Sequence, residues 1–174
     1  LGTHPVAFPA GTGAFMSLNA LTVSGDSLYF LGNDGSINTL SLWKIPATGN
    51  PVRVKRIPWT NTLEYNGNGL TSMGQNRVAF VLTINGQDSL WVSDGTESGT
   101  FPLSGDFSQP DWPFSMGGAL FFIARDADTI SRLWRYDYGG APIPVTGADL
   151  NLCPTRGQSL GYTAGWMIFP ALET

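Results

Sequence analysis

The stretch that decides the fold class is residues 78–91, which read VAFVLTINGQDSLW. It opens on the short apolar strand core Val78-Ala79-Phe80, passes through the pair Asn85-Gly86 and ends on Leu90-Trp91. Asn-Gly is a strong hairpin signal, because the tight turn needs positive φ angles that Asn and Gly tolerate. Trp91 lies 11 residues past Phe80, about the distance that a hairpin of two short strands requires. This stretch therefore predicts a β-hairpin.

The same pattern recurs along the chain. The strand cores share a terminal phenylalanine and are separated by 50, 42 and 47 residues, at Phe30, Phe80, Phe122 and Phe169. Three of them are followed after 13, 11 and 12 residues by a Leu-Trp pair, which ends at Trp43, Trp91 and Trp134. Periods of about 40–50 residues are typical of propeller blades.

Two more strands complete each predicted repeat. A segment that ends in Gly precedes each core, at residues 21–25, 70–74, 114–117 and 160–165, and is expected to form the first strand. Turn-forming residues join the core to the Leu-Trp strand, at residues 33–36, 85–86 and 126–128. A second turn and a Pro-containing segment follow the Leu-Trp strand, the latter at residues 51–54, 101–103 and 142–145. Proline cannot donate to a sheet ladder, so this last segment is expected at the sheet edge.

The predicted fold class is all-β, with four-stranded antiparallel blades of the β-propeller type. One repeat-built region is expected over residues 1–174, with about three and a half blades. Because residues 2–6 align with residues 99–103, residues 1–8 are expected to be the outer strand of a preceding blade. The remaining parts are blades at 9–57, 58–106 and 107–149 and a half blade at 150–174.

Propellers usually carry about 4–8 blades, so this pattern favours a segment of a larger protein. Open strand edges recruit partners, because unpaired N–H and C=O groups in a row are a template for pairing. The isolated segment is therefore expected to associate, whereas a longer chain or a multi-chain fibre would cover its edges.

The composition favours a folded chain with a nearly neutral surface. Of 174 residues, 42% are hydrophobic and 13% are charged, against a usual charged share of about 25%. The net charge of −4 argues against nucleic acid, since the one basic cluster, Arg53, Lys55 and Arg56, straddles both faces of a strand. No apolar run approaches the roughly 18 residues that cross a bilayer, so the chain is not expected to span a membrane.

The chain offers few residues for catalysis or cofactor binding. It has one histidine, His4, and one cysteine, Cys153. One residue of each type is too few for a zinc site of the usual His and Cys kind. A Ser-His-Asp mechanism would depend on His4, which aligns with Phe101 on an expected outer strand. The sequence therefore predicts neither an enzyme nor a cofactor.

Two acidic pairs could bind calcium or serve a glycosidase: Asp126 with Asp128, and Asp94 with Glu97. Both pairs lie in turn segments, where acidic side chains favour local hydrogen bonds to the backbone. The turn interpretation is preferred, and Asp126 and Asp128 are kept as weak candidates for a metal site.

Tryptophan is the residue type that most favours ligand binding, since indole faces stack on sugars and cations. Trp43, Trp91 and Trp134 recur at the same strand position and are expected between neighbouring sheets. Trp59 and Trp112 each lie beside a proline, at an expected crossover between one blade and the next. Because loops carry function more often than core strands, Trp59 and Trp112 are the candidate ligand-binding residues.

Residues 90–100, LWVSDGTESGT, closely resemble the ELWxxDGT repeat of large secreted or surface proteins with a propeller-like or hyalin-like character. The other repeats keep the Leu-Trp pair and lose the Asp-Gly-Thr element, while Gly2-Thr3 looks like the tail of another copy. The resemblance implies an extracellular or cell-surface location and an adhesive or scaffolding role, with other proteins or glycans as partners. It implies no catalytic residues.

The sequence leaves two functions open. The favoured one is a non-catalytic extracellular module for adhesion or surface scaffolding. The alternative is a fragment of a propeller lectin or glycosidase whose site is completed by missing blades. An arginine or carboxylate cluster in such blades would favour the alternative.

Overall fold

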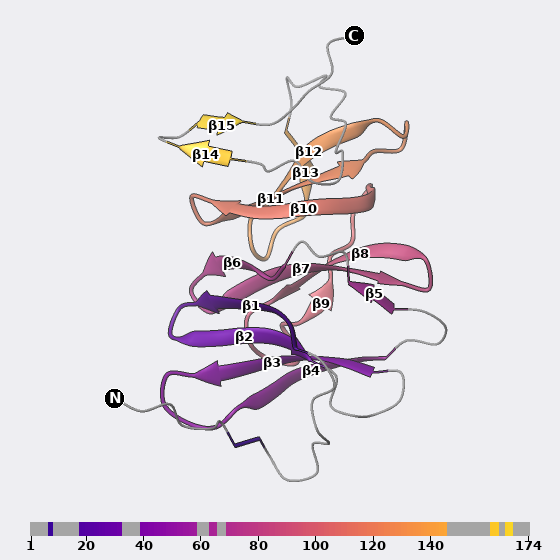
Figure 1. The fold of residues 1–174 in the computed structure, drawn as a ribbon. Helices are drawn as coiled ribbons and strands as arrows, with labels where there is room; N and C mark the ends of the chain where they lie inside the picture. Colours follow the sequence, from indigo (N-terminus) through magenta and orange to yellow (C-terminus); the bar gives the residue numbers. More distant parts are fainter. Residues whose placement is uncertain are drawn as a thin grey trace. The chain divides into compact units, whose positions relative to one another are not determined.

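The computed structural model describes residues 7–8, 18–32, 39–58, 63–65, 69–145, 161–163 and 166–168. Over these residues the chain is all-β, and every strand pair is antiparallel (Figure 1). None of the described residues forms a helix long and apolar enough to cross a membrane. The chain divides into two compact units, Leu1–Leu103 and Ser104–Thr174. The predicted all-β class is therefore confirmed.

Three sheets repeat the same strand order. The first sheet contains β1 (Leu18–Ser24), β2 (Ser27–Gly32), β3 (Thr39–Pro46) and β4 (Val52–Pro58). The second contains β5 (Leu63–Tyr65), β6 (Thr71–Gly74), β7 (Arg77–Ile84), β8 (Gln87–Ser93) and β9 (Phe101–Pro102), with β5 and β6 both paired to β7. The third contains β10 (Ser108–Met116), β11 (Ala119–Arg125), β12 (Ser131–Tyr136) and β13 (Ile143–Pro144). A separate hairpin joins β14 (Gly161–Thr163) to β15 (Trp166–Ile168).

The expected turns and edge strands are present where the structure describes them. Asn85 and Gly86 join β7 to β8 with φ angles of 53° and 79°, the left-handed values that the Asn-Gly signal predicts. The Pro-containing strands β4, β9 and β13 are the last strands of their sheets. The turn expected at residues 33–36 and the outer strand expected at residues 2–6 lie outside the described residues.

A stacked Phe–Trp pair occupies the same place in each of the three sheets. The pairs face each other directly across the two central strands, as Phe30–Trp43, Phe80–Trp91 and Phe122–Trp134. Their ring planes lie within 4°, 9° and 15° of parallel, at centroid distances of 6.3, 6.2 and 6.4 Å. The Leu-Trp periodicity in the sequence thus marks a repeated contact between aromatic rings.

Two of the three repeated tryptophans are buried, and the third is only half-buried. Trp43 is 1% exposed and Trp134 is 4% exposed. Phe8 lies edge-on over the first pair, and Phe107 packs on the third. In the part of the chain that the structure describes, no such third ring covers the second pair, and Trp91 stays half-buried. The buried positions expected for these tryptophans are present at Trp43 and Trp134, whereas Trp91 is only partly buried, against the core between the first two sheets.

Strand geometry gives each sheet two different faces. Successive side chains on a strand point to opposite faces, so a Leu-Trp pair places one residue on each. We name the face with the stacked Phe–Trp pair the Trp face and the opposite face the Leu face. Leu42, Leu90 and Leu133 lie on the Leu faces of the first, second and third sheets.

The first two sheets pack against each other through unlike faces. The Leu face of the first sheet meets the Trp face of the second in one buried core. The first sheet contributes Tyr29, Leu31, Leu40, Leu42, Val54 and Ile57, and the second contributes Leu70, Val78, Phe80 and Leu82. Burying side chains of this size stabilises a fold by about 1.5–3 kcal/mol each, so this contact dominates the first unit.

The first strand of each of the three larger sheets is interrupted at the same register position by a residue with a left-handed backbone. Ala20, Gly69 and Trp112 have φ angles of 53°, 72° and 55°. Two residues after each of them comes a residue that pairs with the equivalent position of the next strand. These pairs are Thr22–Tyr29, Thr71–Ala79 and Phe114–Phe121. In β1 and β10 the interruption is a bulge, and in the second sheet it separates β5 from β6. A bulge twists an edge strand and disfavours pairing with another chain.

The repeated left-handed position predicts opposite effects for opposite substitutions. A left-handed backbone costs a residue with a Cβ atom about 1–2 kcal/mol, and glycine avoids this cost. Gly69→Ala should therefore lower the free energy of unfolding by about 1 kcal/mol, whereas Ala20→Gly should leave it unchanged or raise it. The measurement is urea denaturation of each variant.

Ala79→Gly supplies the matched control, because Ala79 is buried within β7 and has no left-handed backbone. This variant should lower the free energy of unfolding by about 1 kcal/mol. Equal losses for Ala20→Gly and Ala79→Gly would contradict the left-handed assignment.

Candidate functional site

The turn between β8 and β9, residues 94–99, closes on itself through a dense set of hydrogen bonds. Asp94 Oδ1 accepts from the Thr96 amide at 2.9 Å and from the Thr96 hydroxyl at 2.6 Å. Thr96 Oγ1 accepts in turn from the Gly99 amide at 3.0 Å, and Thr100 Oγ1 donates to the Thr96 carbonyl at 2.6 Å. Each polar residue of the Asp-Gly-Thr element therefore satisfies backbone groups of its own turn.

Two buried hydroxyl groups tie this turn to the strands on either side. Ser93 Oγ accepts from the Gly95 amide at 3.0 Å and lies 2.7 Å from Thr100 Oγ1. Ser93 and Thr100 are 0% and 1% exposed. Gly99 is required for a different reason, since a Cβ atom at this position would collide with the Asp94 carboxylate.

The turn also holds the first sheet against the second. Lys44 Nζ, from β3, donates to the Gly95 carbonyl at 2.9 Å, and Lys55 Nζ, from β4, donates to the Glu97 carbonyl at 3.3 Å. The Tyr29 hydroxyl lies so close to Gly95 that a Cβ atom there would collide with it. Gly95 has a φ angle of 83°, which also favours glycine.

Tyr29 fixes a neighbouring turn of the second sheet as well. Its hydroxyl donates to the Asn76 carbonyl at 2.7 Å. Burial, and to a smaller degree the negative charge of Asp94, raises the pKa of Tyr29, so the hydroxyl stays protonated as a donor. Ser24 Oγ adds a parallel bond to the Arg77 carbonyl at 2.7 Å.

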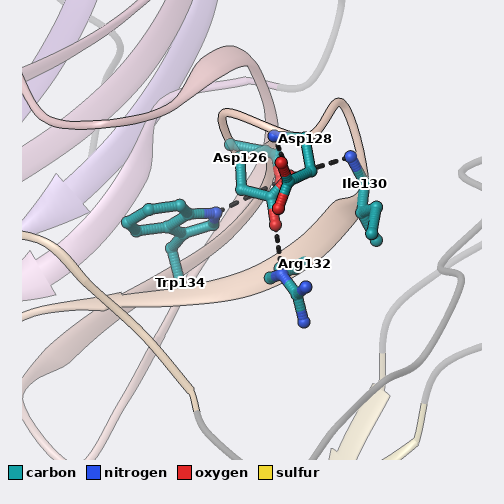
Figure 2. Close-up of polar contacts among 6 residues, drawn as sticks. Asp126, Asp128, Ile130, Arg132 and Trp134 are labelled. Atoms are coloured by element: carbon teal, nitrogen blue, oxygen red, sulfur yellow. Dashed lines mark hydrogen bonds and ion pairs between the residues drawn. The ribbon is translucent and has the colours of Figure 1, made fainter.

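The Asp126 carboxylate closes the turn between β11 and β12 (Figure 2). Its Oδ1 atom accepts from the amides of Asp128 and Ile130, at 3.0 and 2.9 Å. Its Oδ2 atom accepts from Arg132 Nε in an ion pair. The hydrogen bond from Arg132 and its positive charge, together with the two amides, hold the pKa of Asp126 below its ordinary value of 3.8.

Asp128, the second weak metal candidate, is exposed and enters these contacts through its amide. Over the described ranges, no three His, Cys, Asp or Glu side chains are grouped so that they could hold a metal ion. Asp94 and Glu97 share one turn, but the Asp94 carboxylate bonds within that turn, whereas Glu97 contributes its carbonyl.

Of the two candidate ligand-binding tryptophans, the structure describes only Trp112. Trp59 lies outside the described residues. Trp112 was expected in a crossover loop, and this placement is wrong, because Trp112 lies inside β10. The bulge explains the difference, because it lets the strand continue through Pro113, the proline beside Trp112 on which the expected crossover was based.

Trp112 is half-buried, and its amide donates to Asp111 Oδ1 at 2.8 Å. For a bulky residue, its φ angle of 55° is a strained conformation, and such strain is often found at functional sites. The sequence carries no common signal for this left-handed position, because its three residues, Ala20, Gly69 and Trp112, are of different types.

Comparison with known proteins adds little to this geometry. No protein-family model matches the sequence, and no curated protein matches it. Among solved structures, the chain is similar to a serine-to-alanine mutant of puromycin hydrolase complexed with PGG, with 13% identity and a TM-score of 0.39. The match covers 78% of this chain and 30% of that structure.

The contact between Gly95 and Tyr29 can be tested with a double-mutant cycle. Gly95→Ala should lower the free energy of unfolding by more than the 1–2 kcal/mol expected from its φ angle alone, because the new methyl group displaces the Tyr29 hydroxyl. Tyr29→Phe alone should cost about 1–2 kcal/mol through the lost bond to Asn76. The double variant should lose less than the sum of the two by at least about 0.5 kcal/mol, measured by chemical denaturation. Strict additivity would show that the two residues do not meet.

The Asp126 ion pair predicts a pH-dependent stability difference. Because the pKa of Asp126 is lower in the folded chain than in the unfolded one, its stabilising effect is complete above about pH 4 and is lost as the pH falls further. The difference in melting temperature between wild type and Asp126→Asn should therefore be constant from pH 7 to about pH 4 and shrink below it. Asp128→Asn is the matched control and should melt like wild type throughout. A difference for Asp126→Asn that persists at pH 2 would argue against this ion pair.

Proposed function

We propose that the chain is a non-catalytic binding or structural module of the ELWxxDGT type, which acts in adhesion or scaffolding at the cell surface. The observation that carries the proposal is the position of the motif. Its Asp, Gly and Thr close a turn, and that turn joins one repeated sheet to the next through Lys44, Lys55 and Tyr29. A motif used in this way supports a chain whose repeats form a rigid framework.

The proposal includes a propeller-like arrangement in which each four-stranded sheet is one blade. Packing of the Leu face of the first sheet on the Trp face of the second supports it, because each sheet then offers an unlike face to its neighbours. Repeated sheets of this kind are the usual units of a β-propeller.

The partners proposed for this module are other proteins or glycans outside the cell, with Trp59 and Trp112 as the binding residues. Trp112 has the half-buried indole and strained backbone described above, which favour a displayed, rigid side chain. A lectin is the nearest alternative function, and the same indole would then stack on a sugar ring.

Binding to immobilised surface glycoproteins and to polysaccharides tests the proposal. Trp112→Ala should weaken binding about tenfold, which corresponds to the roughly 1.4 kcal/mol of one aromatic contact. Phe101→Ala is the matched control, since Phe101 is an aromatic residue that is 38% exposed on the edge strand β9, and it should bind like wild type. Both variants should still melt cooperatively, and Trp112→Ala should melt at a somewhat lower temperature because it loses the packing of a half-buried side chain.

Two results would count against the proposal. Release of reducing sugar ends from a bound polysaccharide would show catalysis and favour a glycosidase. Absence of binding to every glycoprotein and polysaccharide tested would overturn the adhesive role and leave only the structural one.

A further inference from the structure

The strands of the first sheet carry only positive charges. Strands β1 to β4 contain no Asp or Glu, and their charged residues are Lys44, Arg53, Lys55 and Arg56. The strands of the second and third sheets, by contrast, each include charges of both signs. Because the whole chain has a net charge of −4, this positive sheet is a local exception.

The contact between the first two sheets accounts for only two of these four cations. Lys44 and Lys55 lie on the Leu face and donate to carbonyls of the turn at residues 94–99, at 2.9 and 3.3 Å. Arg53 and Arg56 are both exposed. The packing of the sheets therefore explains the lysines and leaves the arginines unexplained.

A β-bulge brings the two arginines onto one face. Regular alternation would place Arg53 with Lys55 on one face of β4 and Arg56 on the other. Arg53 pairs with Trp43 across the strands, and the register of β4 then shifts. After this shift Arg56 pairs with Ser41, which shares a face with Trp43. Both arginines therefore lie on the Trp face, about as close as alternate residues of a regular strand, roughly 7 Å. Bulges often re-aim a side chain in this way beside functional sites.

The repeat itself does not require these arginines. Opposite the repeated tryptophan, the first sheet has Arg53, whereas the second has Pro102 and the third has Pro144. The edge strands β9 and β13 are two residues long and pair no residue at the position of Arg56. The arginine pair is thus an addition to one of the three larger sheets, which favours a role in binding over a role in the framework.

Two further features of the Trp face suit an anionic ligand. Arg53 Cζ lies 5.9 Å from the centre of the Trp43 ring, and this cation–π contact holds the guanidinium group in place. Ser41, the partner of Arg56, is fully buried, and its Oγ atom has no hydrogen-bond partner among the described residues. Buried polar groups nearly always have a partner, so this hydroxyl is a donor that a ligand oxygen can satisfy.

We propose that Arg53 and Arg56 form a binding site for the carboxylate or sulfate groups of an acidic polysaccharide. Guanidinium groups bind such oxygens through paired N–H donors, and the Ser41 hydroxyl on the same face is a further donor. The net negative charge of the chain disfavours nucleic acid as the source of the anion. The anion site rests on the first sheet alone, whereas the choice of a polysaccharide rests on the proposed function.

Matched polymers with and without charge test the site. Polygalacturonate and its full methyl ester share a backbone, as do dextran sulfate and dextran. The full chain should bind at least one acidic polymer about tenfold more tightly than its neutral counterpart, as expected for charge-assisted hydrogen bonds. The measurement is biolayer interferometry at a physiological salt concentration. Arg53→Gln together with Arg56→Gln should bring this ratio of affinities close to one.

A second pair of arginines supplies the matched control. Arg125 and Arg135 are exposed in the third sheet, and replacing both by Gln changes the net charge by the same amount. This control should keep the wild-type ratio, and an equal fall in both double variants would overturn the proposal. Arg56→Gln alone leaves the contact of Arg53 with Trp43 in place. It should lower the ratio about threefold, and it keeps the test decisive if the double variant does not fold.

Exchange for lysine separates a built site from charge attraction. Arg53→Lys together with Arg56→Lys keeps the charge and loses the paired donors, so the ratio should fall at least about threefold. A wild-type ratio in this variant would overturn the proposal, as would single-stranded DNA that binds more tightly than the acidic polysaccharides. Trp112→Ala should weaken binding to charged and neutral polymers alike and leave the ratio unchanged. Failure of the anion site and failure of the proposed function are therefore distinguishable.

Discussion

The structure depends on the alternation of side chains along the third strand of each sheet. Because neighbouring residues point to opposite faces, the recurring Leu-Trp pair gives every sheet one face with a stacked aromatic pair and one aliphatic face. In the first unit these unlike faces meet, Tyr29, Leu31 and Leu42 against Phe80 and its neighbours. A neighbouring sheet covers only one of these faces, and in the first sheet Phe8 packs on the stacked pair of the other face.

The Asp-Gly-Thr turn adds direction to this apolar contact. Apolar faces alone would allow two sheets to slide, whereas hydrogen bonds to single carbonyls need a defined alignment. Lys44 and Tyr29 reach the turns at Gly95 and Asn76, and Gly95 has no side chain in the way. The motif that resembles a surface-protein repeat therefore acts at the junction between two repeats, and this explains why Asp, both glycines and both threonines occur together.

The bulged first strand links this framework to the proposed binding role. A left-handed residue recurs at one register position, as Ala20, Gly69 and Trp112, which shows that the interruption belongs to the repeat and not to any one side chain. Where the residue is small, the bulge only bends the edge strand. Where it is Trp112, the same backbone holds a large, half-buried indole in place, so a feature of the framework can also display a binding residue.

Sequence alone determined the elements and their period. The Phe cores, the Leu-Trp pairs, the Asn-Gly turn and the Pro-containing edge strands depend on local geometry, which adjacent residues specify, and their predicted order agrees with the described sheets. Only the tertiary structure decided which faces meet, why Trp91 is less buried than Trp43, and that Trp112 lies in a strand. Those outcomes depend on residues far apart in the chain, such as Tyr29 with Gly95 or Phe8 with Trp43, and no local pattern encodes the distance between them.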